Sequence, residues 1–378
     1  MSENNFVKLG DVAHECRLTW SGGQTDIPIV GLEHLVPGEI ELSSWDSNIE
    51  HTFSKKFLKG QVLLGRRRVY LKKAVVAPCD GICSGDITVI ESTGGILPEL
   101  LPFVIQNDRF FDYAMQGSAG SLSPRVKWEH LKNYEFSLPP LAEQKVLADK
   151  LWAAYRLKES YKKLLATTEE MVKSQFIEMF GIAESTKPLA DFIEASFPGE
   201  WGQEDKDGSG VKVIRTTNFT NNGKLDLSDV VTRDIDSAKI EKKKLFKGDI
   251  ILERSGGTND NPVGRVVYFE EDGVYLFNNF TQLLRCKEGV NSLFISYSLF
   301  NYYQMNKNVI RSMGNKTTGI QNLKMDRYWQ IPIADISTER QKEFESIFRQ
   351  ADKSGSGGRE SVVLMGKVKK SLINYYNI

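Results

Sequence analysis

The sequence has few cysteines and no long apolar run. Four cysteines among 378 residues are too few for a disulfide framework, which favours a reducing compartment. The longest apolar stretches, such as residues 96–105, are interrupted by prolines and fall well short of the roughly 18 residues that a membrane span needs. The first eleven residues are polar and lack the apolar core of a signal peptide. These absences predict a soluble, cytoplasmic protein.

An excess of charge of either sign is also missing. The 49 basic and 49 acidic side chains cancel, which excludes a protein that coats nucleic acid through an overall basic surface. Local basic patches remain compatible with this balance. With 40% apolar and 26% charged residues the composition is that of an ordinary globular protein. Its length predicts two or three domains.

The usual catalytic motifs are absent as well. There is no Walker A motif, no G-x-G-x-x-G opening a helix, no H-E-x-x-H and no Pro-Asp…Glu-x-Lys nuclease pattern. Residues 260–263 (DNPV) distantly resemble the Asn-Pro-Pro-aromatic motif of amino-methyltransferases, but they lack its second proline and its aromatic ring, and so predict a turn. Four histidines offer little acid–base machinery. We therefore predict no catalytic residue, no bound cofactor and no metal site, since the spacing of the candidate ligands fits no known pattern (His14, Cys16, Cys79 and Cys83).

What the sequence does contain is a long internal repeat. Four matches recur in the same order about 190 residues apart, and preserved order argues for duplication. Each half has short runs rich in Val, Ile and Tyr between Gly and Asn turns, and then a helical segment, which predicts a mixed α+β fold. The matching segments are residues 8–12 and 188–192, 35–43 and 219–228, 57–64 and 245–252, and 138–145 and 331–342.

A helix of unusual length closes the first half. Residues 141–180 contain no Gly or Pro, and Gly181 is placed to cap the end of a rod of roughly 60 Å. Apolar residues three and four apart form a stripe that is longer than one core needs, so we expect an antiparallel partner helix from residues 337–378. A helix packed only on its own domain is the alternative. The residues expected at the helix pair or at a partner's docking surface are Leu147, Leu151, Leu157, Tyr161, Leu164, Met171 and Phe176.

The second helical region differs from the first in one respect. Residues 353–358 (KSGSGG) contain three glycines, each of which costs about 1 kcal/mol inside a helix. The sequence therefore predicts two shorter helices with a flexible joint near residues 354–358.

Two pairs of loops carry residues suited to DNA. Residues 55–73 hold eight basic residues and no acidic one, with three consecutive arginines that suit phosphate and guanine contacts. Gly-rich loops with hydroxyl groups and a cation precede each long helix and suit phosphate binding. Solvated loops or plain hairpins are the alternative. The predicted DNA-contacting residues are Lys59, Arg66, Arg67, Arg68, Lys72, Ser118, Ser121 and Arg125 in the first half, and Lys247, Arg254, Ser255, Asn259, Arg265, Asn315, Lys316 and Thr317 in the second.

The duplicated organisation, with residues 138–145 (LPPLAEQK), the helix to Gly181, residues 8–12 and the repeated strand 57–63, resembles the DNA-specificity (S) subunit of type I restriction-modification systems. The resemblance implies an α+β fold with two target-recognition domains related by pseudo-twofold symmetry and separated by long antiparallel, coiled-coil-like helices. The implied bounds are 1–138 and 182–332 for the recognition domains, and 139–181 and 333–378 for the helical regions.

The resemblance also implies a function. Each recognition domain would read one half of a bipartite site in double-stranded DNA. The helices would set the spacing and dock two methyltransferase (M) subunits, which bring S-adenosylmethionine and methylate adenine; restriction (R) subunits would bring ATP and Mg. The chain itself would be non-catalytic and bind no cofactor. The alternative is a scaffold or anti-restriction decoy that binds the M subunits and reads no DNA, which the zero net charge favours and the arginine cluster opposes.

Overall fold

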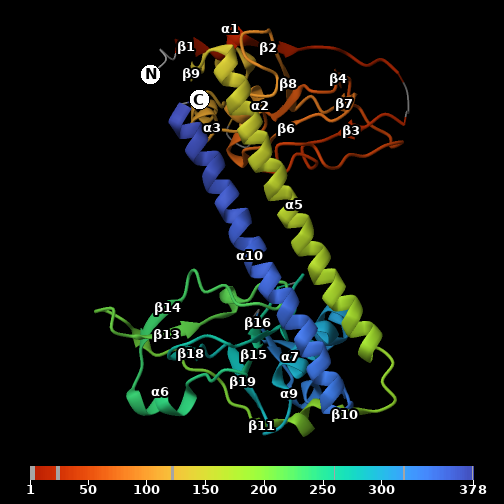
Figure 1. Ribbon diagram of the computed structural model, residues 1–378, viewed down its shortest axis with the longest axis vertical. Helices are drawn as coiled ribbons and strands as arrows, with labels where there is room; N and C mark the ends of the chain where they lie inside the picture. The colour runs from red at the N-terminus through yellow and green to blue at the C-terminus, as the bar shows by residue number, and fades with distance from the viewer. Residues whose placement is uncertain (1–4, 23–25, 121–122, 259, 318–319, 377) are drawn as a thin grey trace. The chain divides into compact units, whose positions relative to one another are not determined.

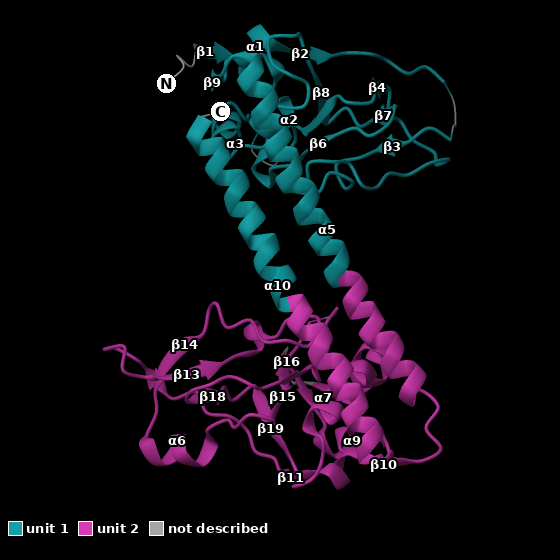
Figure 2. Cartoon of the chain, in the orientation of Figure 1, with its two compact units in different colours: residues 1–165, 356–378 teal, residues 166–355 magenta. Residues whose placement is uncertain are grey.

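The chain forms two compact units (Figures 1 and 2). The computed structural model describes residues 5–22, 26–120, 123–258, 260–317, 320–376 and 378. Unit 1 comprises residues 1–165 and 356–378, and unit 2 comprises residues 166–355. Both units share the two long helices, α5 (Leu141–Phe180) and α10 (Thr338–Tyr376). No helix in the described part of the chain is both long and apolar enough to cross a membrane.

Unit 1 is built on an antiparallel four-stranded sheet in the order β2-β8-β5-β6. A second sheet has three strands in the order β3-β7-β4. Its β3–β7 pair is parallel and its β4–β7 pair is antiparallel. A two-stranded ribbon, β1–β9, joins the start and the end of the unit. The elements are β1 (Asn5–Lys8), α1 (Leu9–Val12), β2 (Ala13–Cys16), β3 (Ile29–Val30), β4 (Lys55–Phe57), β5 (Val62–Gly65), β6 (Ala74–Val76), β7 (Gly81–Cys83), β8 (Ile87–Ser92), α2 (Leu101–Ile105), α3 (Asp108–Gln116), α4 (Trp128–Leu131) and β9 (Glu135–Leu138).

Unit 2 has a four-stranded antiparallel sheet in the order β11-β19-β15-β17. A second sheet, β12-β14-β13-β18, contains the parallel pair β13–β18, and β16-β21-β20 and β10-β22 complete the strands. The elements are β10 (Thr186–Pro188), β11 (Ile193–Ala195), β12 (Gln203–Glu204), β13 (Val211–Ile214), β14 (Val231–Asp234), α6 (Ser237–Lys243), β15 (Ile250–Glu253), β16 (Ser255–Gly256), β17 (Val266–Tyr268), β18 (Tyr275–Phe277), β19 (Thr281–Cys286), α7 (Ser292–Met305), α8 (Lys307–Ser312), β20 (Gly314–Thr317), β21 (Ile320–Leu323), α9 (Met325–Tyr328) and β22 (Pro332–Ala334).

The internal repeat is visible in the strand order. The main sheets β2-β8-β5-β6 and β11-β19-β15-β17 have the same order and the same antiparallel directions. Each unit also has one parallel pair, β3–β7 or β13–β18, and one closing ribbon, β1–β9 or β10–β22. In both units the central strand, β5 or β15, is buried along its whole length, because the sheet is covered on both faces. The predicted duplication and the α+β fold class are confirmed.

The two long helices pack on each other and on the cores. Helix α5 ends at Phe180, as predicted, and the backbone N–H of Gly181 donates to the carbonyl of Ile177 at 2.7 Å. In unit 1, Ile373 near the end of α10 joins the core that contains the early α5 residue Leu147. In unit 2, Phe344 near the start of α10 meets Phe176, near the end of α5, edge to face at 5.1 Å. The helices are therefore antiparallel within each unit, as predicted (Figure 1).

The predicted break in the second helix is wrong, because α10 runs unbroken through residues 354–358. Gly355 and Gly358 are buried, and a Cβ atom at Gly358 would lie 3.1 Å from Leu165. The glycine therefore lets α10 approach α5 closely. The hydroxyl of Ser354 donates to the carbonyl of Gln350, four residues earlier in the helix. Tertiary packing outweighs a helix-propensity cost of about 1 kcal/mol for each glycine.

A half-buried lysine of α10 supplies a first testable expectation. Lys369 lies over the ring of Phe103 at 5.7 Å and donates to Gln106 at 3.3 Å. Burial lowers the pKa of this amine to about 8, and the positive charge of Lys158 adds to the effect. Below pH 8 the folded chain must bury the charged amine. Between about pH 8 and 10.4 the unfolded chain binds the additional proton, so the free energy of unfolding rises with pH in this window.

We therefore expect Lys369→Met to raise the free energy of unfolding at pH 7 by about 2–3 kcal/mol and to remove the rise above pH 8. Urea unfolding at pH 7, 8.5 and 10 measures both effects. Lys370→Met is the matched control, because Lys370 is exposed. Equal changes in the two variants would show that burial of the amine is not the cause.

Candidate nucleic-acid interface

In unit 1 the two loops predicted to contact DNA form one surface. Strand β5 is followed by Arg66–Arg68, and the second loop spans residues 117–126. The backbone of Arg67 forms a β-bridge with that of Arg125, and the N–H of Arg68 donates to the carbonyl of Pro124 at 2.8 Å. Segments almost sixty residues apart in the sequence are thereby joined. We call them the unit 1 loop surface.

An aspartate orients two arginines of the unit 1 loop surface. Arg125 donates two hydrogen bonds to Asp86, at 2.7 and 3.2 Å, and Arg67 lies 3.6 Å from the same carboxylate. Hydrogen bonding from Arg125, with the charges of the neighbouring arginines, holds the pKa of Asp86 below its usual range. Arg67 also donates to the hydroxyl of Ser123 at 2.5 Å. With Arg66 and Arg68 the surface has four arginines against one aspartate, so it keeps an excess of positive charge.

Arg68, the last of the three consecutive arginines, begins a strained turn. Arg68 and Lys72 have φ angles of 53° and 52°, a left-handed conformation that non-glycine residues adopt rarely. They flank a 3-10 turn, Val69–Leu71, on which Tyr70 is 51% and Leu71 42% exposed. Lys72 pairs with Asp108 at 2.5 Å, which fixes one end of the turn. Arg68 is exposed and has no side-chain partner among the described residues, so its guanidinium is free to meet a ligand.

Unit 2 joins the equivalent loops through regular strands. After β15, the short strand β16 pairs with β21, so that Ser255 lies opposite Asn322 and its hydroxyl donates to the Asn322 side chain at 2.6 Å. Strand β21 forms a hairpin with β20, on which Asn315 is exposed and opposite Asn322. The backbone of Arg254 accepts from the N–H of Leu323 at 2.8 Å. We call this the unit 2 loop surface; Lys316 also lies in β20.

Other predicted residues lie away from these surfaces. Lys59 and Lys247 precede β5 and β15, whereas the arginines follow these strands, so the lysines lie at the opposite strand ends. Lys247 is paired with Asp272 at 2.7 Å, and Lys59 is exposed. Ser118 is half-buried, and its hydroxyl has no partner in the part of the chain that the structure describes. Of the remaining predicted residues, Thr317 lies in β20, and Ser121 and Asn259 fall outside the described residues.

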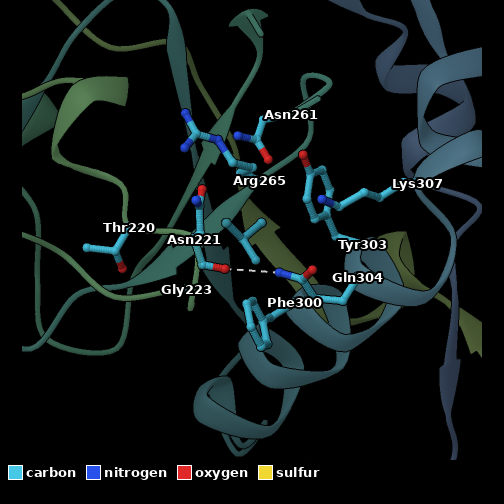
Figure 3. A pocket seen from close by; sticks show the side chains of 10 residues that line it. Thr220, Asn221, Gly223, Asn261, Arg265, Phe300, Tyr303, Gln304 and Lys307 are labelled. Carbon is cyan, nitrogen blue, oxygen red and sulfur yellow. Dashed lines mark hydrogen bonds between the residues drawn. The ribbon is translucent and has the colours of Figure 1, made fainter. Parts of the chain in front are cut away.

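Arg265 points inward instead of toward a ligand. It forms a two-point ion pair with Glu253, at 2.7 and 3.1 Å, and Glu253 is only 1% exposed. It also donates to the carbonyls of Phe219 and Thr216, at 3.2 Å each. Its guanidinium borders a cavity of about 110 Å³, which Tyr303 also lines (Figure 3). These contacts favour a structural role for Arg265.

The predicted stripe on α5 divides into two faces. Leu147 and Leu151 are buried in the core of unit 1, Phe176 is buried in that of unit 2, and Tyr161 is half-buried. In contrast, Leu157, Leu164 and Met171 are 45%, 56% and 48% exposed. These three recur every seven residues and share one outward face of the helix. The apolar periodicity of the sequence does not distinguish the two faces of α5. The exposed fractions of the side chains in the structure do.

Sequence reasoning missed several residues of these surfaces. Asp86 orients two arginines but stands 19 and 39 residues away from them in the sequence, without a local motif. Tyr70 and Leu71 lie within the basic segment 55–73, and exposed apolar residues between cations were the signal available there. Asn322 follows the second Gly-rich loop, and the residues of its strand, Ile-Gln-Asn-Leu, show no apolar alternation that would mark it in the sequence.

Comparisons with known proteins agree with this architecture. Residues 185–356 match the model of the family described as type I restriction modification DNA specificity domain. The specificity subunit of the type I restriction enzyme EcoDI from Escherichia coli is 25% identical over 182 residues, which are 46% of this chain and 38% of that subunit. The match therefore spans less than half of the curated relative.

Solved structures resemble the whole chain in fold. The S subunit of a type I restriction-modification system from M. genitalium is 11% identical, with a TM-score of 0.61, covering 100% of this chain and 97% of that one. A chain from the structural study of complex assembly and conformational transition of the type I R-M system is 15% identical, with a TM-score of 0.50, covering 100% and 98%. The predicted resemblance to type I specificity subunits is confirmed.

Proposed function

We propose that the chain is the DNA-specificity subunit of a type I restriction-modification complex, and that each unit reads one half of a bipartite target. One observation carries this proposal: both units build a loop surface from the same two segments, the one after the central strand and the one before the closing ribbon. One of these surfaces lies in residues 185–356, the segment that matches the DNA specificity domain.

The unit 1 loop surface suits phosphate and guanine. Guanidinium groups donate paired hydrogen bonds to phosphate oxygens and to the O6 and N7 atoms of guanine in the major groove. Asp86 already orders Arg67 and Arg125, so less side-chain freedom is lost when DNA binds. Arg68, exposed beside Tyr70, supplies a guanidinium that no acidic group neutralises within the residues that the structure describes.

The unit 2 loop surface has different chemistry. It presents the amide of Asn315 and the cation of Arg254 instead of an arginine cluster, whereas Ser255 is buried with its hydroxyl bonded to Asn322. Asparagine side chains pair with the N6 and N7 atoms of adenine. Because the two units offer different donor sets, we propose that the two half-sites differ in sequence.

The remaining parts of the proposed function involve partner subunits. The outward face of α5 with Leu157, Leu164 and Met171 is the proposed dock for M subunits, and α5 with α10 sets the half-site spacing. The M subunits would supply S-adenosylmethionine for adenine methylation, and R subunits would supply ATP- and Mg-dependent restriction. The chain itself would carry no cofactor and no catalytic residue.

Arg68→Ala tests DNA reading in unit 1. We expect the complex of this chain with its M subunit to bind target DNA more weakly. If Arg68 contacts only phosphate, the loss should be uniform across sequences and the salt slope should fall by about 1. If it reads guanine, the loss should be about 1–3 kcal/mol and confined to one base position. Affinity measured at several salt concentrations, with methylation mapping, distinguishes the two cases.

Lys59→Ala is the matched control, since Lys59 is an exposed cation at the other end of β5. It should leave affinity unchanged. A variant with alanine at Arg66, Arg67 and Arg68 that still methylates the native site normally would contradict DNA reading by this surface. That result would favour a scaffold that binds M subunits alone.

A further inference from the structure

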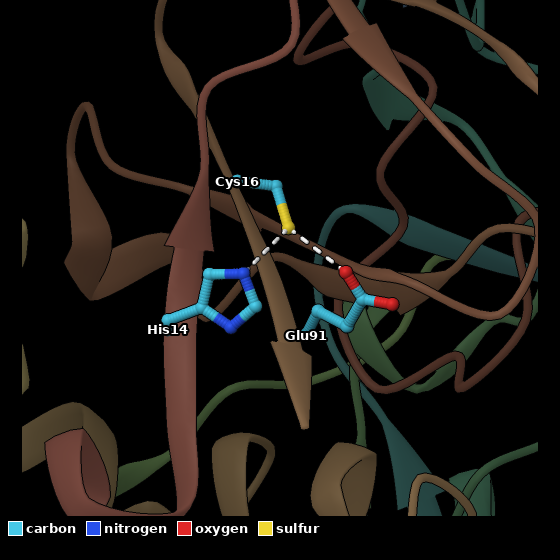
Figure 4. A group of neighbouring side chains, drawn as sticks. All are labelled: His14, Cys16 and Glu91. Atoms are coloured by element: carbon cyan, nitrogen blue, oxygen red, sulfur yellow. Dashed lines mark hydrogen bonds between the residues drawn. The ribbon is translucent and has the colours of Figure 1, made fainter. Parts of the chain in front are cut away.

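Three side chains with metal-binding atoms converge on the sheet of unit 1 (Figure 4). Strands β2 and β8 pair so that His14 lies opposite Glu91, and Cys16 lies two residues further along β2 on the same face. The Nε2 atom of His14 is 3.6 Å from the Sγ atom of Cys16, which is 3.2 Å from Oε2 of Glu91. One ligand atom from each residue lies within 4.8 Å of the other two.

These separations agree with a tetrahedral zinc site. Zinc binds sulfur at about 2.3 Å and nitrogen or oxygen at about 2.0–2.2 Å, so neighbouring ligand atoms in a tetrahedron lie roughly 3.3–3.6 Å apart. The donor set also selects the ion. Thiolate, imidazole and carboxylate together suit zinc or cobalt, whereas calcium and magnesium prefer oxygen ligands alone.

A buried amide supports the two anionic ligands. Gln61 is only 3% exposed, and its Oε1 atom accepts from the N–H of Leu58 at 2.8 Å, which fixes the orientation of the amide. Its Nε2 group therefore faces the cluster and donates to Cys16 at 3.3 Å and to Glu91 at 3.0 Å. Such outer hydrogen bonds hold metal ligands in place and stabilise their negative charge.

We propose that His14, Cys16 and Glu91 bind a divalent cation of the zinc class, with the fourth position open to water. The site joins the edge strand β2 to β8, so the bound ion would fasten the N-terminal part of unit 1 to its main sheet. In the structure the Cys16 thiol donates to Oε2 of Glu91. Metal binding must therefore release a proton.

The proposed ligands differ from the set that the sequence analysis weighed and rejected, His14, Cys16, Cys79 and Cys83. Within the described residues, neither Cys79 nor Cys83 belongs to a group of converging metal ligands. Glu91 takes their place because the β2–β8 register brings it opposite His14, seventy-seven positions away in the sequence. Spacing along the chain does not show this arrangement.

Cobalt(II) titration of the full chain under reducing conditions tests the proposal. We expect one equivalent of cobalt to give the strong visible bands of a tetrahedral ion and a thiolate-to-cobalt charge-transfer band, and zinc to abolish both. Cys16→Ser should remove the charge-transfer band. His14→Ala should abolish stoichiometric binding, and Gln61→Leu should weaken affinity by about 10–100-fold.

Two matched controls keep the result specific. Cys79→Ser and His51→Ala remove a cysteine and a histidine that lie outside the cluster, and both should bind cobalt as the parent does. If Cys16→Ser fails to fold, His14→Ala decides the question, because His14 is exposed. Absence of the charge-transfer band in the parent chain, or its persistence in a folded Cys16→Ser or His14→Ala variant, overturns the proposal. These readouts do not depend on DNA binding.

Discussion

Exchange of residues 188–332 for the corresponding segment of a related specificity subunit should change one half of the methylated target and leave the other half intact. The junction is favourable, because β10 and β22 pair with Pro188 opposite Pro332, so the chain enters and leaves the segment at neighbouring points. The segment also contains the sheets of unit 2 and the unit 2 loop surface. Because α5 and α10 lie outside the exchanged segment, both helices should stay unchanged in the exchanged chain.

The expected effect is large. Each mismatched base pair costs about 1–3 kcal/mol, so an old half-site that differs at three positions would lose roughly 3–9 kcal/mol of binding free energy. Long-read methylation mapping in cells that express the exchanged chain with its M subunit measures the outcome. Exchange of residues 5–138 is the reciprocal control and should alter the opposite half-site. A change of both half-sites by either exchange would contradict the proposal that each unit reads independently.

Glu253→Ala should destabilise unit 2 by about 3–5 kcal/mol, because it leaves the guanidinium of Arg265 buried without its counter-ion. The side chain of Glu253 is 2% exposed and that of Arg265 is 17% exposed, so water can screen the orphaned charge only weakly. Glu253 also ends β15 directly before Arg254. Loss of the pair should therefore disturb the unit 2 loop surface and weaken binding to the second half-site.

Urea unfolding, followed by circular dichroism, measures the change in the free energy of unfolding. Glu270→Ala is the matched control: Glu270 pairs with Arg349 at 2.8 Å, but both side chains are more than 40% exposed. Such a pair contributes about 0–1 kcal/mol. Similar losses in the two variants would show that burial of the Glu253–Arg265 pair has no particular energetic weight.

Patterns repeated along the chain were readable from the sequence. The duplication, the α+β class and the bounds of α5 all follow from local signals: ordered matches, alternating apolar residues, and forty residues without Gly or Pro. The two pairs of loops proposed to contact DNA were also recognisable, because Gly, hydroxyl groups and cations cluster within a few residues. Each of these signals lies within a short window, where backbone preference and side-chain period dominate.

The pairing of distant residues was decided only by the tertiary structure. Arg265 looked free in the sequence, but strand pairing brings Glu253 beside it, whereas Arg68 has no acidic partner among the described residues. The glycines of α10 suggested a break, yet close packing of Gly358 on Leu165 retains the helix. In α10 a contact with Leu165 outweighs a local preference of about 1 kcal/mol, and one sequence does not reveal such contacts or the pairing of charged residues.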